Sequence, residues 1–221
     1  MVGNIWTSSN RRILTLAVLA VGMALVHAQD TETVRLPPPQ LDRGKSLMQA
    51  LAQRRSSRAF SDREIGPQVL ANLLWAAFGV NRPASGRRTA PSAVNWQEID
   101  IYVAQASGVY LFDARHHALK RVLAEDIRTI VGLQDFTRDA PVTLIYVADF
   151  ARMGKASMAD KVFYSATDTG FVSQNVYLFC ASENLATVVI GLVDRAALGR
   201  KLELRETQRV ILAQPVGYPA R

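Results

Sequence analysis

The chain has 221 residues, of which 49% are hydrophobic and 20% charged, a composition typical of a globular protein and not of a disordered or fibrous one. Its formal charge of +7 comes from basic residues scattered along the chain. They form no basic stripe with interleaved aromatic residues, which argues against nucleic-acid binding. The length favours one domain.

The N-terminus has the three parts of a secretory signal. Arg11 and Arg12 precede the apolar run 13–26, and Val26-His27-Ala28 offers small residues where a signal peptidase reads them. The run is short for a membrane span. We therefore expect residues 1–28 to be a signal peptide cleaved after Ala28 and the folded part to be exported, in the periplasm. An uncleaved membrane anchor is the alternative. Because residues 10–14 also match a twin-arginine signal loosely, the export route stays open.

Residues 29–40 are expected to form a proline-rich linker, with Pro37-Pro38-Pro39 favouring an extended arm. Two helices should follow. The first, over 44–54, should bury its apolar residues, and the second should begin at Pro67 and end at Gly79 as a left-handed cap. The apolar residues of the first helix are Leu47, Met48 and Leu51. Residues 81–89 have the composition of a basic loop.

The period then changes to two, as expected for strands. A hairpin is predicted over 99–103 and 109–112, with a turn at Ser107-Gly108. The continuous apolar run 142–147 fits a strand buried on both faces. A long helix over 159–183 is apolar nearly all round in its second half, which predicts burial in a core or across a dimer interface. Short elements complete an α+β pattern of a small sheet flanked by helices: a helix at 125–133, a strand at 187–190, a helix at 195–202 and a strand at 209–214.

Three segments could carry chemistry. In Arg54-Arg55-Ser56-Ser57-Arg58, guanidinium forks and hydroxyls suit phosphate oxygens, although a solvated basic helix end is an equal alternative. The polar loop 89–97 could read the edge of a planar heterocycle by hydrogen bonds, but a plain capping loop has the same composition. In the strand and turn 188–194, Gly191 would let the backbone approach a ligand closely, or would simply form an ordinary turn.

Other chemistry is poorly supported. Cys180 is the only cysteine, so no intramolecular disulfide can form, and its apolar surroundings predict a buried, inert thiol. His116 and His117 are expected at the surface in a turn, without the neighbouring cysteines or carboxylates of a metal site. No Gly-x-Gly-x-x-Gly motif indicates a Rossmann nicotinamide domain.

Together, four segments in series resemble the nitroreductase family. They are Arg54-Arg55-Ser56-Ser57-Arg58-Ala59-Phe60, Pro91-Ser92-Ala93-Val94-Asn95-Trp96-Gln97, the helix containing Gln174-Asn175, Ala181 and Leu185, and Val216-Gly217-Tyr218-Pro219. The sequence Arg88-Thr89-Ala90-Pro91-Ser92-Ala93 resembles that of the SagB/ThcOx-type dehydrogenase branch most. The resemblance covers residues 41–221 and implies a mostly antiparallel sheet flanked by helices, an intertwined homodimer and FMN as cofactor.

The resemblance also implies roles for individual residues. Arg54 and Ser56 would hold the FMN phosphate, Arg55 would contact the ribityl chain, and Arg58 would lie by the flavin pyrimidine. From the partner subunit, Ser92, Ala93 and Asn95 would meet the isoalloxazine ring. Ile190 and Gly191 would lie over its reactive face. Asp168 falls near a polar position that faces the flavin, and Arg221 is a candidate for a further phosphate contact.

The activity implied is a two-electron, hydride-type transfer at flavin N5 to or from a small organic substrate, such as a nitro compound, a quinone or an azoline-type heterocycle. No catalytic side chain and no metal are needed, because the cofactor carries the chemistry. A nicotinamide donor is not expected outside the cytoplasm, so the electron donor or acceptor stays unidentified. The alternatives are a catalytically idle flavin- or ligand-binding protein with this fold and, less favoured, a membrane-tethered interaction module without cofactor.

Overall fold

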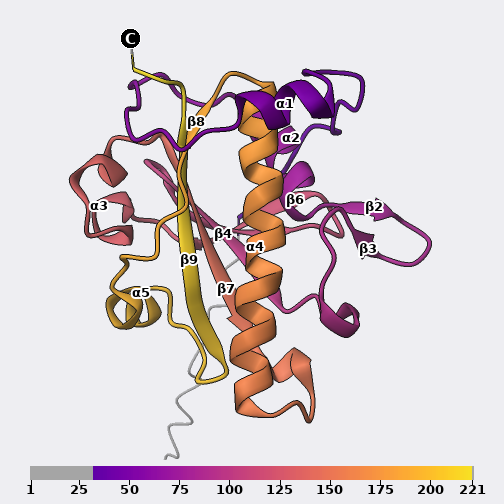
Figure 1. Cartoon of the computed structure of the whole chain (residues 1–221). Coiled ribbons are helices and arrows are strands. Elements are labelled where there is room, and N and C mark those ends of the chain that lie inside the picture. Colours follow the sequence, from indigo (N-terminus) through magenta and orange to yellow (C-terminus); the bar gives the residue numbers. More distant parts are fainter. Residues whose placement is uncertain (1–31, 221) are drawn as a thin grey trace, which may run out of the picture. The chain divides into compact units, whose positions relative to one another are not determined.

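The computed structural model describes residues 32–220, so the predictions for the signal peptide and for Arg221 lie outside the described residues. The centre of the fold is a seven-stranded sheet with the order β1-β6-β5-β4-β7-β9-β8 (Figure 1). Every neighbouring pair is antiparallel, which confirms the predicted sheet type. The strands are β1 (Thr33–Arg35), β4 (Ile99–Gln105), β5 (Gly108–Asp113), β6 (Ala118–Leu123), β7 (Val142–Asp149), β8 (Ala186–Thr187) and β9 (Gln208–Gly217).

Helices cover both faces of this sheet. One face packs against α2 and α4, and the other packs against α3, α5 and the segment that follows β8. The α-helices of the described residues are α1 (Leu47–Gln53), α2 (Pro67–Phe78), α3 (Arg128–Val131), α4 (Met158–Ser182) and α5 (Arg195–Lys201). Short 3-10 turns are η1 (Ala93–Asn95), η2 (Asp135–Arg138) and η3 (Phe150–Met153). Within residues 32–220, no helix combines the length and the apolarity needed to cross a membrane.

The strand β7 is buried on both faces along its whole length, as predicted. Leu144 and Tyr146 belong to the core under α2 and α4, whereas Ile145 and Val147 belong to the core under α3 and α5. Side chains of a strand alternate between the two faces of the sheet. Because both cores need apolar residues from β7, its apolar residues form a continuous run along the sequence.

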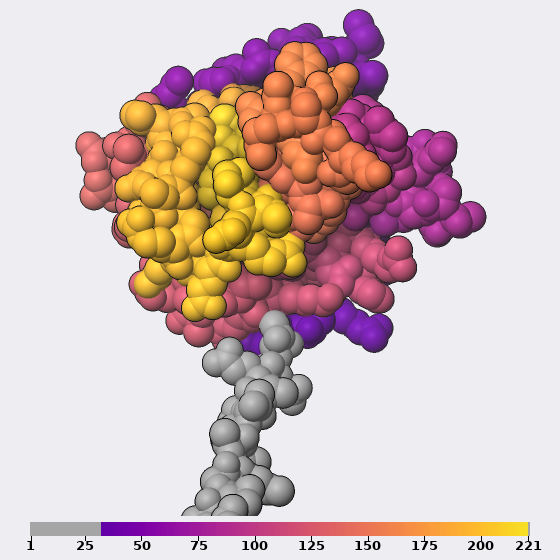
Figure 2. All heavy atoms as spheres, turned by 90° about the horizontal axis from the view of Figure 1, so that it is seen from below, coloured from indigo at the N-terminus to yellow at the C-terminus, as the bar shows by residue number. Residues whose placement is uncertain are grey.

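Helix α4 begins at the cap Ser157, whose side chain accepts a hydrogen bond from the Asp160 amide. Its buried residues recur every three or four positions along one side, at Ser165, Asp168, Thr169, Val172, Ser173, Val176, Tyr177 and Cys180. Only this one side of α4 is therefore buried within the chain. The first turns of α4 lie beside the segment that leads into β9 (Figure 2). Near this end, the Phe150 amide of η3 donates a hydrogen bond to the Thr207 carbonyl.

Four elements differ from the sequence predictions. Strand β1 (Thr33–Arg35) lies within the stretch 29–40 that was expected to be a linker. Strand β6 was not expected, because Lys120 and Arg121 interrupt the apolar alternation. The predicted loop 81–89 contains a short hairpin of β2 (Val80–Arg82) and β3 (Arg87–Arg88). The helix predicted over 125–133 is reduced to the single turn α3.

Two local predictions are wrong. Gly79 is not a left-handed cap; it has φ −71° and ψ 163°, an extended conformation that leads directly into β2. A Cβ atom at this position would lie 2.7 Å from the Trp75 backbone, so close approach and not positive φ explains the glycine. In α1 the residues expected to be buried are exposed instead, and only Ala50 is buried. The exposed fractions of Leu47, Met48 and Leu51 are 63%, 73% and 45%.

Candidate functional site

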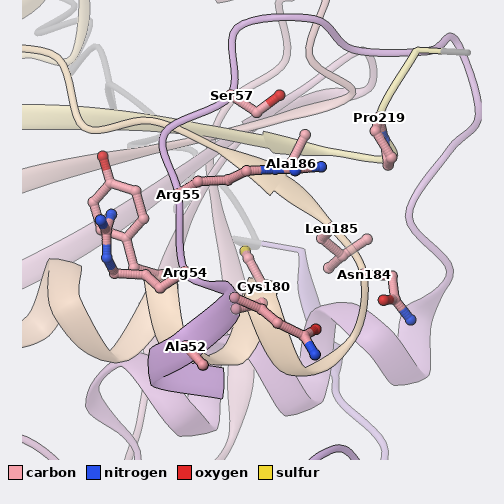
Figure 3. A pocket seen from close by; sticks show the side chains of 12 residues that line it. Ala52, Arg54, Arg55, Ser57, Cys180, Asn184, Leu185, Ala186 and Pro219 are labelled. Atoms are coloured by element: carbon pink, nitrogen blue, oxygen red, sulfur yellow. The ribbon is translucent and has the colours of Figure 1, made fainter. Parts of the chain in front are cut away.

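A pocket of about 680 Å³ lies between the end of α1, the last turns of α4 and strand β8. Its volume is in the range of roughly 300–1,000 Å³ that is usual for small-molecule and cofactor sites. Arg54 and Arg55 come from one side, and Asn184, Leu185 and Pro219 line the other (Figure 3). The pocket therefore brings the first candidate segment next to the chain that follows α4.

The arginine segment is held in place by backbone hydrogen bonds. Helix α1 ends at Gln53, and the next residue, Arg54, has φ −57° and ψ 124°, which turns the chain into an extended conformation. The Ser57 amide then donates to the Thr187 carbonyl of β8 at 2.9 Å. A few residues later, Ser61 donates to Tyr218 and Ala220 donates to Ala59, which fastens the C-terminal segment beside residues 59–61.

Tyr177 of α4 links the arginine segment to the strand region after α4. Its hydroxyl lies 2.9 Å from the Ser56 hydroxyl and accepts a hydrogen bond of 2.8 Å from the Val189 amide. The Arg54 guanidinium lies over the Tyr177 ring, 5.2 Å from its centroid. Sequence reasoning took Tyr177 for one apolar residue of a buried helix, and its hydroxyl was the signal that could have marked it. Ser57, which was part of the candidate segment but was given no role of its own, lines the pocket where Ser56 does not.

The positive charges of this segment have no carboxylate partner in the described part of the chain. None of the ion pairs within residues 32–220 involves Arg54, Arg55 or Arg58. Arg58 instead lies 5.8 Å from the Phe136 ring centroid, outside the pocket. Uncompensated guanidinium groups next to a pocket can bind an anion bidentately, and phosphate is the usual choice.

Ile190 and Gly191 come directly after Val189, whose amide bonds the Tyr177 hydroxyl. Ile190 is buried and pairs with Ala213 of β9 through two backbone hydrogen bonds of 2.8 and 3.0 Å. Gly191 is exposed, and a Cβ atom there would meet only Leu212, at 3.6 Å. The packing of the chain itself therefore does not require a glycine at this position.

The loop that contains Ser92, Ala93 and Asn95 is built differently. Ser92 caps it by accepting a hydrogen bond from the Gln97 amide at 2.9 Å. Val94, Asn95 and Gln97 all have positive φ, between 50° and 57°, which is costly for residues other than glycine. Such clustered backbone strain is typical of functional loops and needs support from the surrounding structure.

Asp168 supplies that support. Its carboxylate is buried and accepts a hydrogen bond of 2.8 Å from the Ala93 amide. Asp168 thus holds the loop from beneath and contacts its backbone. Of the sequence-predicted residues, this loop and Asp168 form one group, and the arginine segment with Ile190 and Gly191 forms another.

The two groups lie apart in a single chain. Asp168 and Tyr177 are nine positions apart on α4, which corresponds to about 14 Å along a helix that rises about 1.5 Å per residue. The loop residues do not line the pocket at the end of α4.

The cysteine and the two histidines of the described residues have structural surroundings and no sign of catalytic use. Cys180 is buried at the back of the pocket, and burial raises the pKa of its thiol, as expected for an inert cysteine. His116 is exposed and contacts Asp113, as predicted for a surface residue. His117 is half-buried and bonds the Pro37 carbonyl at 3.0 Å, so it anchors the proline-rich arm.

Two known proteins are similar to this chain over most of its length. A protein of Methanocaldococcus jannaschii, provisionally named a nitroreductase, is 30% identical over 197 residues, which are 84% of this chain and 97% of that protein. The crystal structure of a protein from Ralstonia eutropha, also provisionally named a nitroreductase, is 39% identical with a TM-score of 0.82, covering 86% of this chain and 90% of that one.

More distant structures share the fold. The NADPH:FMN oxidoreductase of Vibrio harveyi, solved with NAD+, has a TM-score of 0.61 at 20% identity and covers 80% of this chain and 70% of that one. The family profile described as "Nitroreductase family" matches residues 51–218, which include both groups of candidate site residues. The chain therefore belongs to the nitroreductase family.

Proposed function

We propose that this protein is an exported, homodimeric, FMN-dependent oxidoreductase that transfers two electrons to or from a small organic substrate. The observation that carries the proposal is the arginine segment, whose guanidinium groups lie at a pocket of cofactor size without carboxylate partners among residues 32–220. The related NADPH:FMN oxidoreductase of Vibrio harveyi supports the choice of FMN as the cofactor.

The residues present fit this cofactor. In our proposal Arg54 and Ser56 hold the phosphate, Arg55 follows the ribityl chain, and Arg58 lies toward the pyrimidine. The hydroxyl of Ser57 adds a directional donor at the pocket wall. The exposed Gly191 leaves room for a planar ring to approach the backbone, and Ile190 is held against β9 beside it. Arg221, beyond the described residues, would add a further phosphate contact.

A second copy of the chain would complete the site. Apolar side chains on two neighbouring helices are exposed, a feature that marks protein–protein interfaces. They are Leu47, Met48 and Leu51 of α1 and Met158, Val162, Phe163 and Phe171 of α4. Because Ser92, Ala93 and Asn95 lie away from the pocket of their own chain, we place them against the flavin ring of the partner chain.

When bound, FMN would supply the two-electron chemistry, so the protein needs no catalytic acid–base pair. The chain's own residues bind and orient the cofactor and cover it from water. Nitro compounds, quinones and azoline-type heterocycles are the substrate classes proposed, the last by resemblance to the SagB/ThcOx type. In the periplasm the electrons would come from or pass to a partner other than a nicotinamide, such as a quinone or oxygen. Cleavage after Ala28 would release the protein, and N-terminal sequencing should then begin at Gln29.

Replacing two of the arginines tests the cofactor site. We expect Arg54→Ala combined with Arg58→Ala to weaken FMN binding by at least about a hundredfold, because each charge-assisted hydrogen bond contributes roughly 1.5–3 kcal/mol. Fluorescence titration of residues 29–221 with FMN measures this. Arg35→Ala combined with Arg200→Ala is the matched control, since it removes the same charge at exposed positions outside the pocket.

Full retention of FMN by the first variant would refute the phosphate site, and a wild-type protein that binds no FMN would refute the whole proposal. An idle flavin-binding protein is distinguished by anaerobic stopped-flow experiments. An enzyme's bound flavin is bleached by a donor and recovers when an acceptor is added, whereas an idle binder's flavin responds to neither within turnover times.

A further inference from the structure

Two acidic side chains are buried together beneath the loop 92–97. Glu98, the residue before β4, is fully buried, and Asp168 of α4 is 2% exposed. Asp168 raises the pKa of Glu98 both as a neighbouring negative charge and as a side-chain hydrogen-bond partner. Neither carboxyl oxygen of Glu98 meets a side-chain donor elsewhere in residues 32–220. Nothing in the proposed electron transfer uses this pair.

Two adjacent carboxylates cannot both stay ionised in a buried site, so one of them must hold a proton. Burial, with a smaller contribution from the neighbouring Asp168, raises the pKa of Glu98 to about 7. The backbone amide of Glu98 itself opposes this shift in its pKa, and Arg152, whose guanidinium bonds the Asp100 carboxylate at 2.6 Å, opposes it less.

The other charged groups near Glu98 are already paired. Arg152 also donates to the Gln97 carbonyl at 2.9 Å. The Asp149 amide donates to the Glu98 carbonyl, and the carboxylate of Asp149 is bound by Arg205 and Thr207. The proton that the pair requires therefore stays between Glu98 and Asp168.

The distribution of the proton matters for the loop. Asp168 can accept the Ala93 amide best as a charged carboxylate, and Glu98 can stabilise that charge only by donating its own proton. The bond to Ala93 in turn opposes the strain stored in the three residues with positive φ.

We propose that Glu98 and Asp168 are a positioning pair that shares one proton and holds the loop 92–97 in the shape in which it meets the flavin ring. The proposal rests on the FMN function proposed above. Flavin affinity then depends on the protonation of a group that never touches the flavin.

The direction of the pH dependence follows from the linkage. The pKa of Glu98 in the folded protein lies above its ordinary value of 4.5, so the folded state binds the proton more tightly than the unfolded state. The stability contributed by the proton is fully present below the ordinary pKa of 4.5 and is lost as the pH rises through the pKa of the folded protein, about 7. The anchoring of the loop, and with it flavin affinity, should therefore decrease as pH rises through neutrality.

Binding of FMN and of riboflavin at different pH values tests the pair. Between about pH 6 and about pH 8, the affinity of the wild-type dimer for both ligands should fall by about five- to tenfold. Riboflavin lacks the phosphate, so its titration excludes ionisation of the ligand as the cause. Glu98→Gln should bind with nearly constant affinity, because its amide donates to Asp168 at every pH. Glu206→Gln, which changes an exposed acid, should behave as the wild type.

The outcomes separate the two proposals. Wild-type protein that binds neither ligand at any pH contradicts the proposed function. Protein that binds both with the same affinity across this range, or a Glu98→Gln variant that keeps the wild-type pH dependence, overturns the positioning pair and leaves the function intact. If Glu98→Gln does not fold, infrared spectroscopy of the wild type decides, because the C=O stretch of a buried protonated carboxyl group should disappear as pH rises. Its absence at low pH overturns the pair.

Discussion

At the scale of single residues, Tyr177 connects the parts of the candidate site. The Tyr177 hydroxyl bonds both Ser56 in the arginine segment and the Val189 amide next to Ile190. The Arg54 guanidinium lies over the ring of the same tyrosine. The phosphate side and the ring side of the proposed site are therefore fixed relative to each other by one side chain of α4. A tyrosine in a buried stripe can thus have a polar function that its apolar neighbours hide.

Removing this hydroxyl should loosen the site without unfolding the protein. In Tyr177→Phe the half-buried Val189 amide loses its partner and Ser56 loses its anchor, so we expect FMN affinity to fall by about five- to tenfold, the equivalent of about 1 kcal/mol. Fluorescence titration measures the affinity and thermal unfolding checks the fold. Tyr164→Phe, which alters an exposed tyrosine, is the control. Equal FMN affinity for Tyr177→Phe and the control would mean that Tyr177 is only a packing residue.

At the scale of elements, the junction between α2 and β2 depends on one glycine. Gly79 follows the last turn of α2 so closely that an added methyl group would collide with the backbone of Trp75. The junction also carries the Arg88 side chain, which donates to the Phe78 carbonyl and to Gln97 of the 92–97 loop. The geometry of the loop is therefore tied to the end of α2.

We expect Gly79→Ala to lower the free energy of unfolding by about 1–3 kcal/mol, because the collision is with backbone atoms that cannot move aside easily. Urea denaturation measures this change. The matched control is Gly199→Ala in α5, where a new Cβ meets nothing within 4 Å and alanine should stabilise the helix by about 0.5–1 kcal/mol. If both variants were equally stable, the crowding at Gly79 would have no energetic consequence.

At this scale the sequence predicts best those elements whose burial leaves a pattern. Strand β7 is buried on both faces, so its continuous run of apolar residues predicts it correctly. The proline at the start of α2 and the helical spacing of its apolar residues predict that helix. Strand β6 lies between β1 and β5, and its Lys120 and Arg121 obscure the alternation. Strand β6 forms a hairpin with its neighbour β5, but its other partner, β1, is distant in the chain and cannot be predicted from a local period.

At the scale of the whole molecule, the exposed apolar side chains of α1 and α4 point to a second copy. Sequence reasoning expected Leu47, Met48 and Leu51 to be buried, and within one chain they are not. The period of a helix reveals that it has an apolar face, but does not reveal whether that face meets the same chain or another. In the proposed dimer, the arginine segment of one chain would meet the loop 92–97 of the other, although the two do not meet within one chain.

Charges on this surface should separate the subunits. Leu47→Glu combined with Met48→Glu places two carboxylates in the proposed interface, so we expect sedimentation velocity to show a dimer for the wild type and a monomer for the variant. FMN affinity should fall with it, because the loop of the partner is lost. Val122→Glu, an exposed apolar residue on β6, should change neither property. A monomer that binds FMN as tightly as the wild type would contradict the role assigned to the partner's loop.

The pairing of residues 59–61 with the C-terminal segment has a practical consequence. The last described residues run beside the stretch that follows the arginines, and Pro219 itself lines the pocket. We therefore expect an affinity tag or fluorescent protein fused to the C-terminus to hinder the entry of FMN into the proposed site. A short environment-sensitive dye attached there would, for the same reason, report occupancy directly.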